Sequence, residues 1–373
     1  MKVRKWYALF LCLVLVLFVY GCQAVTNQTD EYESVSSELE QYEPDSYEAN
    51  QDESDLNETD SDEIDLVEAY LQETDLDEME IFEIDISGFN QFHLTILHTN
   101  DWHGVLHNVP MYSTLVQEIR AERENVLLLD GGDIYRRGPF EELHGTAEIA
   151  VMNAMGYDAL VFGNNDFPRN DEELFHVSQH TILQQAEFPV LCANVTLDGE
   201  FVEGFEPFII ATMQDINIAI IGVTSPKPWD RNFDFTQRYL FECPLIVVER
   251  LTEETSEISD IQIVLSHAGF DLERQMSGVS AVIGGDDHRI LRAPYVINDG
   301  DRRVPVVQAG GENNHFLGRL DLHFVEIDEA WILHDFYGSL LSVEDVTPDP
   351  EIQSIINYYR AMLGLEIEYP DND

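Results

Sequence analysis

The sequence predicts an α/β protein arranged as a four-layer α/β/β/α sandwich with mixed sheets. Between residues 93 and 343, short runs rich in Val, Ile and Leu alternate with longer amphipathic stretches. That alternation is typical of strands connected by helices. After residue 304 the apolar runs follow one another without a helical stretch between them, which indicates antiparallel pairing. A segment of about 250 residues is the size of one large domain.

The predicted strands are short apolar runs that end at Gly, Asn, Asp or Pro, residues that interrupt regular pairing. They cover residues 93–98, 125–129, 158–162, 189–192, 206–212, 216–223, 261–266, 280–284, 304–309, 316–324 and 330–337. The predicted helices are longer stretches with apolar residues three or four positions apart. They cover residues 110–123, 141–155, 171–186, 245–257 and 270–277.

The start of the chain has the features of an export signal. Residues 1–5 are basic and residues 6–21 are uncharged and mostly apolar, a stretch short for a membrane span. It ends in VYGC at 19–22, which resembles a bacterial lipobox with Cys22 as the lipid-bearing residue. We expect 1–21 to be a lipoprotein signal peptide, with an uncleaved N-terminal anchor as the alternative. Both predict an extracytoplasmic protein held at the cell membrane of a bacterial envelope.

Residues 22–90 are expected to form an acidic, disordered tether. Between Asp30 and Asp85 there are 24 acidic residues and no Lys, Arg or His. Such a segment cannot bury enough apolar surface to offset the entropy lost on ordering. Repulsion between its charges should keep it extended. We therefore expect it to act as a spacer between the membrane and the folded domain.

The strongly negative net charge of the chain argues against a nucleic acid polymer as a partner. The chain carries 72 acidic and 19 basic residues, a formal net charge of −53 at pH 7. Binding to a nucleic acid polymer requires a basic surface, so we expect no such partner. The sequence does not predict an oligomeric state.

Of the four cysteines, Cys192 lies in an apolar strand and is expected to be buried. A disulfide between Cys192 and Cys243 remains an alternative.

Five short segments place metal-binding side chains at the ends of apolar runs. The segments are TILHTNDWHG, VLLLDGGD, YDALVFGNND, LSHAG and IGGDDH. They present Asp101, His103, Asp133, Asn164, His267, Asp286 and His288. Open α/β folds place their sites at the carboxyl edge of the sheet, where such strand ends meet. Because carboxylate, amide and imidazole groups bind divalent cations, the segments predict a metal centre.

With these segments, residues 93–343 resemble the 5'-nucleotidase and 2',3'-cyclic-nucleotide phosphodiesterase branch of the calcineurin-like metallophosphoesterases. The resemblance continues in FPVLCANV at 188–195, INIAIIGVTSP at 216–226 and VPVVQAGGENNHFLGRLDL at 304–322. It implies a metallophosphoesterase domain over 91–343 with the four-layer fold. It also implies hydrolysis of small-molecule phosphate esters, nucleotides among them, by two divalent metal ions that activate water.

The resemblance also implies two ligand sets that share Asp133 as the bridge. The first set is Asp101, His103, Asp133 and His288, and the second is Asp133, Asn164, His267 and Asp286. Asp286 stands where the family has a histidine, so a nitrogen ligand is replaced by oxygen. This favours harder cations such as Mn²⁺, Mg²⁺ or Ca²⁺ at the second site over Zn²⁺, with Fe as a further candidate. The alternative for Asp286 is an ordinary polar turn after a strand.

The third segment departs from the family at its catalytic position. Asn165 replaces the histidine that assists phosphoryl transfer, and Pro168 replaces the aspartate that orients this histidine. An amide cannot transfer a proton, and general acid–base catalysis contributes typically about 10²–10⁴-fold. The sequence therefore favours a slow metallophosphoesterase, with a pseudoenzyme that binds a metal, a ligand or an envelope protein as the alternative. The candidate catalytic residues are Asn165, Asp166 and Arg136, the last beside Arg137 as a phosphate clamp or as part of a solvated turn.

Residues 344–373 predict a C-terminal helix and an acidic tail. Its apolar face consists of Ile352, Ile355, Ile356, Tyr359 and Leu363. In the family, such a helix leads into a C-terminal domain that binds the substrate. We expect that domain to be absent here, and the sequence then does not specify the substrate.

Overall fold

The computed structural model describes residues 86–167, 178–225, 239–312 and 315–367, and the side chains of 178–180 are not described. The predicted signal peptide, nearly all of the predicted tether, and Pro168 lie outside these ranges. Among the described residues, no helix is both long enough and apolar enough to cross a membrane.

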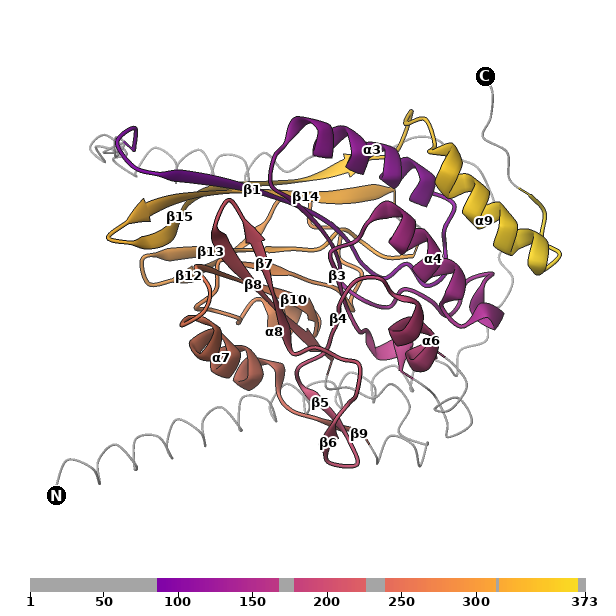
Figure 1. The fold of residues 1–373 in the computed structure, drawn as a ribbon, viewed down its shortest axis with the longest axis horizontal. Helices are drawn as coiled ribbons and strands as arrows, with labels where there is room; N and C mark the ends of the chain where they lie inside the picture. Colours follow the sequence, from indigo (N-terminus) through magenta and orange to yellow (C-terminus); the bar gives the residue numbers. More distant parts are fainter. Residues whose placement is uncertain (1–85, 168–177, 226–238, 313–314, 368–373) are drawn as a thin grey trace, which may run out of the picture. The chain divides into compact units, whose positions relative to one another are not determined.

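Two six-stranded mixed sheets form the centre of the fold (Figure 1). The first runs in the order β15 (Ala330–Ser342), β14 (Phe316–Ile327), β1 (Gln91–Thr99), β2 (Val126–Asp130), β3 (Ala159–Val161) and β4 (Val190–Leu191). The second runs in the order β12 (Tyr295–Asp299), β13 (Arg302–Val307), β11 (Ala281–Ile283), β10 (Ile261–His267), β8 (Ile216–Thr224) and β7 (Phe208–Met213). A small third sheet joins β6 (Glu200–Phe201), β5 (Val195–Leu197) and β9 (Tyr239–Phe241).

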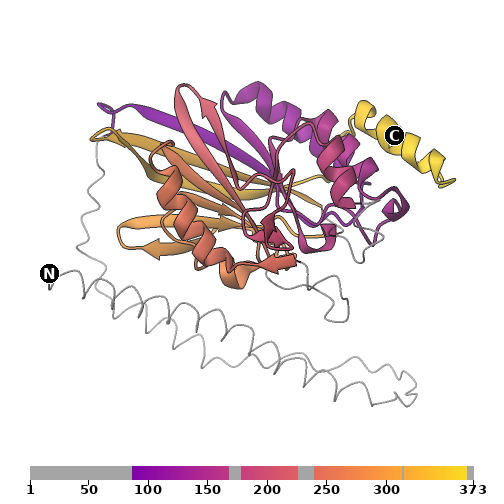
Figure 2. The ribbon, with the colours of Figure 1, turned by 60° about the horizontal axis from the view of Figure 1, so that its bottom comes forward.

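Helices cover the outer faces of the two sheets. The helices on the side of the first sheet are α3 (Val109–Glu122), α4 (Thr146–Met155), α6 (Ser178–Gln185) and α9 (Pro350–Met362). On the side of the second sheet are α7 (Pro244–Thr255) and α8 (Phe270–Glu273). Figure 2 shows the two sheets as adjacent layers between these helices. The predicted α/β/β/α sandwich is therefore confirmed.

Three apolar cores correspond to the three interfaces between the layers. In β1, Ile96 points between the sheets while the next residue, Leu97, points toward the helices. Alternation with a period of two lets one strand contribute to two cores. In the second sheet, Ile263 and Val264 divide in the same way between the sheet–sheet core and the core beneath α7. Strands buried on both faces explain the continuous apolar runs in the sequence.

Several predicted elements differ from the structure. The strand expected at 304–309 does not pair with the one at 316–324, because β13 pairs with β11 and β12 in the second sheet and β14 belongs to the first. The helix expected at 141–155 begins as a 3₁₀ turn at Glu141–Leu143. It restarts as α4 after Gly145, whose φ is 90°. The helix expected at 270–277 is only the four-residue α8.

The C-terminal helix α9 packs against α3 and α4 within the same unit. Asp349 caps it by accepting a hydrogen bond from the main-chain N of Glu351. The same carboxylate accepts hydrogen bonds from Ser113 and Gln117 of α3, both at 2.7 Å. Ile352 and Ile356 are buried in the core on the helix side of the first sheet. The apolar face predicted for this helix is therefore used in packing.

Cys192 is a free thiol, fully buried at the end of β4. The expected burial is confirmed. The alternative of a disulfide with Cys243 is wrong.

Candidate metal centre

The candidate metal centre lies where the carboxyl ends of parallel strands from both sheets meet. Asp101 and His103 follow β1, Asp133 follows β2 and Asn164 follows β3 in the first sheet. In the second sheet, His267 is the last residue of β10, and Asp286 and His288 follow β11. The structure thus brings together all seven predicted ligand residues, from segments up to 187 positions apart in the chain.

One group of side chains gathers around Asp101. His288 Nε2 lies 3.2 Å from Asp101 Oδ1 and 3.2 Å from His103 Nε2. His103 Nε2 lies 3.8 Å from Asp101 Oδ1 and 3.7 Å from Asp133 Oδ2. Asp101, His103 and Asp133 are buried, whereas the side chain of His288 is 30% exposed. The group therefore opens to solvent on the side of His288.

A second group gathers around His267. Its Nε2 lies 3.0 Å from Asn164 Oδ1, 3.3 Å from Asp133 Oδ2 and 3.8 Å from Asp286 Oδ1. Its Nδ1 lies 2.5 Å from the main-chain O of Gly131. A carbonyl at that position keeps the proton on Nδ1 and leaves the Nε2 lone pair for a metal ion. Asp133 Oδ2 is common to both groups, which is the position of a bridging ligand.

The residues present fit divalent cations. Ligand atoms about 2.0–2.2 Å from one cation lie roughly 3 Å apart when they occupy adjacent positions, close to the separations observed here. Asp101 Oδ1 is buried and accepts no hydrogen bond from the described residues. A buried carboxylate oxygen without a donor is costly unless a cation neutralises it.

The carboxylates and imidazoles of the cluster lie close enough to shift one another's pKa values. Burial alone would raise the pKa of Asp133, but the charges of His267 and His103 hold it below its ordinary value. Burial alone would lower the pKa of His267, but Asp133, Asp101 and Asp286 raise it well above 6.5. The buried carboxylates therefore stabilise a positive charge placed among them, as a site for a cation requires.

Left-handed backbone conformations aim these ligands. The φ angles are 55° at Asp101, 48° at His103, 58° at Asp133, 80° at Asp286 and 53° at His288. Such angles are rare outside glycine, although Asp and His tolerate them better than most residues. At the candidate metal centre these angles turn the side chains of five predicted ligands toward the same space. Strained backbone tends to collect at functional sites.

Glycines make room for the ligands. A Cβ atom at Gly163 would collide with Asp133, and one at Gly311 would collide with the ring of His288. A Cβ atom at Gly285 would approach Nδ1 of His267 to 3.0 Å. These three glycines therefore allow close packing around the candidate metal centre.

Asp166 holds two ligand loops together. It is fully buried, and its Oδ2 accepts hydrogen bonds from the main-chain N of Asp133 and of Gly163, both at 2.9 Å. Its Oδ1 accepts from the main-chain N of Ile134 at 3.1 Å. Burial raises the pKa of Asp166 to about 7, with the charge of Asp133 adding to the effect. This predicted catalytic residue therefore lies beneath the centre as a positioning residue.

Asn165 lies against the bridging carboxylate. Its main-chain N donates to Asp133 Oδ1 at 2.7 Å, and its Nδ2 donates to Asp133 Oδ2 at 2.6 Å. The side chain is 9% exposed. Asn165 thus orients the carboxylate of Asp133 with two hydrogen bonds.

Arg136 lies neither as a phosphate clamp nor in a solvated turn, the two alternatives that the sequence left open. It is 3% exposed, and its guanidinium donates hydrogen bonds to the main-chain O of Asn165 and of Phe167 and lies over the ring of Tyr135. Arg137 reaches the centre instead, with Nη2 2.9 Å from His103 Nε2 and a side chain that is 46% exposed. Both residues adopt a left-handed φ of 66°.

Two buried residues that sequence reasoning missed shape the loop of Asp286 and His288. Glu273 of α8 accepts a hydrogen bond from the main-chain N of Gly285 at 3.1 Å and from Gln308 Nε2 at 2.7 Å. Gln308 Nε2 also lies 3.0 Å from the main-chain O of Gly285. Gln308 Oε1 accepts from the main-chain N of Arg289 at 3.0 Å, so Gln308 holds both ends of the turn. A polar residue inside the apolar run VPVVQAGG was the available signal for Gln308.

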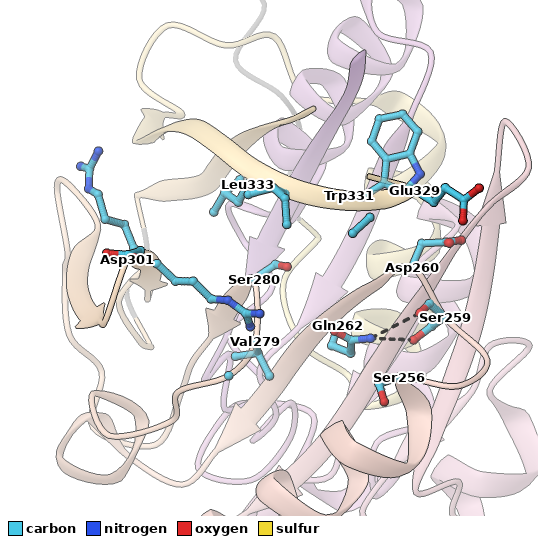
Figure 3. A pocket seen from close by; sticks show the side chains of 15 residues that line it. Ser256, Ser259, Asp260, Gln262, Val279, Ser280, Asp301, Glu329, Trp331 and Leu333 are labelled. Carbon is cyan, nitrogen blue, oxygen red and sulfur yellow. Dashed lines mark hydrogen bonds between the residues drawn. The ribbon is translucent and has the colours of Figure 1, made fainter. Parts of the chain in front are cut away.

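A separate pocket of about 360 Å³ lies at the other end of β10 (Figure 3). Gln262, near the start of β10, lines it, whereas His267 at the end of the strand belongs to the metal centre. In Figure 3, Gln262 points to Ser259, with Nε2 3.0 Å from its hydroxyl. Trp331 and Leu333 of β15 form the opposite wall. The pocket therefore has no ligand in common with the metal centre.

The fold and the centre together define the metallophosphoesterase class of hydrolases. The family model of the calcineurin-like phosphoesterases matches residues 94–290, more than half of the chain. The chain therefore belongs to the calcineurin-like phosphoesterase family, as the resemblance of its motifs implied.

Relatives and solved structures agree with this assignment. Human 5'-nucleotidase is 30% identical over 275 residues, which cover 67% of this chain and 46% of that protein. The trifunctional nucleotide phosphoesterase protein YfkN of Bacillus subtilis is 28% identical over 302 residues, covering 70% of this chain and 20% of that protein. The chain thus spans about half the length of the 5'-nucleotidases it matches.

Two solved structures share the fold. The 5'-nucleotidase precursor of Thermus thermophilus matches with a TM-score of 0.62 and 23% identity, over 73% of this chain and 59% of that one. The calcineurin-like phosphoesterase YfkN of Bacillus subtilis matches with a TM-score of 0.62 and 22% identity, over 74% of this chain and 98% of that one.

Proposed function

We propose that this chain hydrolyses small-molecule phosphate esters with two divalent cations bound in the metal centre. The observation that carries the proposal is the convergence of two ligand groups on Asp133 Oδ2, 3.3 Å from His267 Nε2 and 3.7 Å from His103 Nε2. Because the relatives are named 5'-nucleotidases, nucleoside 5'-monophosphates are the first substrates to test.

The two cation positions differ in their ligands. The first would be held by Asp101, His103, Asp133 and His288, and the second by Asp133, Asn164, His267 and Asp286. The second has one nitrogen among its ligand atoms, which favours a harder cation such as Mn²⁺ or Mg²⁺. When bound, such a pair of cations supplies an activated water and stabilises charge on the phosphoryl group.

The chain's own residues bind and orient the phosphate. The guanidinium of Arg137, half exposed at the opening beside His103 and His288, presents planar donors suited to phosphate oxygens. Asn165 keeps Asp133 oriented through its amide. Because no imidazole stands at that position to donate a proton, we expect esters with good leaving groups to react fastest.

We also propose that the folded part lies outside the cytoplasm, linked through residues 22–90 to a lipid on Cys22. The supporting observations are the basic and apolar start, the VYGC segment and the acidic spacer. Cys22→Ala should move the protein from the membrane fraction to the soluble extracytoplasmic fraction. An unchanged distribution would contradict the lipid anchor.

The function is tested by the hydrolysis of an activated aryl phosphate and of nucleoside monophosphates with Mn²⁺. Asp133→Asn should lower the rate at least about 100-fold, because it weakens both cation sites together. The matched control is Asp215→Asn, an exposed carboxylate in the β7–β8 turn, which should leave the rate unchanged. Equal activity in the two variants would contradict the proposal.

A pseudoenzyme is the second candidate, and Asn165 is the observation that favours it. Turnover measured on protein of known metal content separates the two candidates, since only the first requires the metal-loaded protein to hydrolyse an ester. Protein that retains its metals but hydrolyses no ester with Mn²⁺, Mg²⁺, Fe²⁺ or Zn²⁺ would establish the pseudoenzyme.

A further inference from the structure

Asn100 is a buried polar residue at the candidate metal centre that belongs to neither predicted ligand set. It follows β1 and precedes Asp101, and none of its surface is exposed to solvent. Its Nδ2 donates a hydrogen bond to Asp101 Oδ2 at 2.7 Å and another to the main-chain O of Gly310. Its Oδ1 accepts a hydrogen bond from the main-chain N of Ala309 at 2.9 Å. An amide suits these partners because it carries both donors and an acceptor.

The hydrogen bonds of Asn100 join the two sheets. Asn100 follows β1 of the first sheet, whereas Ala309 and Gly310 follow β13 of the second. Buried polar groups are costly to leave without partners, so this bridge holds the two strand ends in one relative position. A single side chain therefore spans the boundary between the sheets at which the predicted ligands converge.

The bridge also decides which oxygen of Asp101 remains available to a cation. Oδ2 of Asp101 accepts hydrogen bonds from Asn100 Nδ2 and, at 3.1 Å, from the main-chain N of Asp286. Each carboxylate oxygen has two lone pairs, so both lone pairs of Oδ2 are used. Oδ1 is buried without a hydrogen-bond donor among the described residues and lies 3.2 Å from His288 Nε2. Oδ1 is therefore the oxygen left for metal binding.

The same bridge acts on His288 from the second sheet. Gly311 follows Gly310, and a Cβ atom at Gly311 would collide with the ring of His288. The main chain of this segment therefore packs directly against the imidazole. By holding Ala309 and Gly310, Asn100 fixes the surface against which the ring of His288 lies.

We propose that Asn100 is a positioning residue for the first cation site and not for the second. It orients Asp101 directly and His288 through residues 309–311, and both are ligands of the first proposed cation. His267, a ligand of the second cation, is oriented by a different main-chain carbonyl. The inference rests on the two cation positions of the proposed function, but it concerns metal binding and not turnover.

The test is Mn²⁺ binding by equilibrium dialysis, with electron paramagnetic resonance of the bound ions. Asn100→Ala should weaken the first cation by about 10- to 100-fold, the usual effect of losing a group that orients metal ligands, and leave the affinity of the second unchanged. The signal of two coupled Mn²⁺ ions should then give way to that of an isolated ion. On an Asp286→Ala background, which weakens the second site, Asn100→Ala should lower the affinity of the remaining cation by the same factor.

The control is Asn153→Ala, which removes a comparable amide bridge between α4 and the segment after α6. Asn153 Nδ2 donates to the main-chain O of Gln185 at 2.8 Å, and its Oδ1 accepts from the main-chain N of Glu187 at 2.9 Å. This variant should bind both ions like the wild type. Because Asn100→Ala leaves a cavity, Asn100→Ser is measured beside it, and melting temperatures show that each variant is folded.

Unchanged binding of both ions in the folded Asn100 variants would overturn the proposal. Equal weakening of both ions would also overturn it, since that result indicates a general loss of structure. A wild type that binds no Mn²⁺ would instead contradict the proposed function, and this inference with it.

Discussion

Asn165 is the residue at which proton transfer would have to occur, and its amide is committed to Asp133. An imidazole at this position needs both space and an orienting partner. Asn165 is buried, with 9% of its surface exposed. A substitution that restores an imidazole at position 165 therefore tests whether the missing proton donor limits the rate of hydrolysis.

We expect Asn165→His combined with Pro168→Asp to raise turnover of alkyl phosphates, which have poor leaving groups, by up to about 100-fold. The reason is that the pair restores an oriented proton donor with a pKa near roughly 6.5. Aryl phosphates with good leaving groups should gain little. The measurement is kcat on both substrate classes at matched metal content, with Asn165→Gln as the control. No gain on either class would show that the missing proton donor does not limit the rate.

Arg136 and Arg137 form a matched pair for separating stability from substrate binding. Arg137→Ala should lower kcat/KM about 10- to 100-fold with little change in stability, because it removes a half-exposed charged donor. Arg136→Ala should instead reduce the free energy of unfolding by about 2–4 kcal/mol, since it leaves the main-chain carbonyls of Asn165 and Phe167 without their donor. Urea denaturation and steady-state kinetics on both variants decide the assignment. If Arg136→Ala instead lowered kcat/KM and Arg137→Ala lowered the free energy of unfolding, Arg136 would be the residue that binds phosphate.

At the scale of elements, the turn after β11 depends on side chains from elsewhere. Glu273 of α8 and Gln308, which follows β13, hold Gly285 from two directions. The turn carries Asp286 and His288, one ligand of each proposed cation. Its conformation therefore depends on contacts with α8 and with the segment that follows β13.

Gln308→Ala should weaken metal binding at the centre by about 10- to 100-fold, the usual effect of losing the groups that orient metal ligands. Gln262→Ala is the matched control, because Gln262 is also a hydrogen-bonded glutamine of the second sheet but lies at the remote end of β10. Metal content after dialysis against graded chelator measures the effect. Equal retention of metal in the two variants would contradict the role of Gln308.

At the scale of the whole molecule, buried acids make stability depend on pH. Glu148 of α4 is fully buried, and neither of its carboxylate oxygens has a hydrogen-bond partner among the described residues. Burial raises the pKa of Glu148 to about 8, well above the ordinary value of 4.5. The folded state thus prefers the protonated form, and its contribution to stability is complete below about pH 4.5 and lost as the pH rises through about 8.

Glu148→Gln should therefore increase the free energy of unfolding at pH 8–9 by about 2–4 kcal/mol and change it little near pH 4. The exposed neighbour Glu142→Gln serves as the control and should show no such pH dependence. Urea denaturation at several pH values provides the measurement. A gain that is the same at pH 4 and pH 9 would mean that packing, and not ionisation, is responsible.

Local patterns in the sequence determined the strands, the family and the set of ligand residues. A buried strand that ends in Asp, Asn or His is visible without knowledge of its partners, because burial and termination are local properties of the chain. The motif around Asp133 could thus be assigned to the end of β2, where the structure places it. The roles of the ligands in metal binding stay predictions.

Only the tertiary structure decided which sheet each strand joins and which side chains face the metal centre. Strand pairing depends on contacts distant in sequence, so β13 and β14 could not be separated by their apolar runs alone. Which of the two arginines faces the opening was likewise decided by the folded loop, which buries Arg136 and exposes Arg137. The support from Glu273 and Gln308, and the bridge made by Asn100, also arise from neighbours that periodicity does not encode. The sequence by itself therefore determined the residues available for chemistry, and the packing of two sheets decided how they are used.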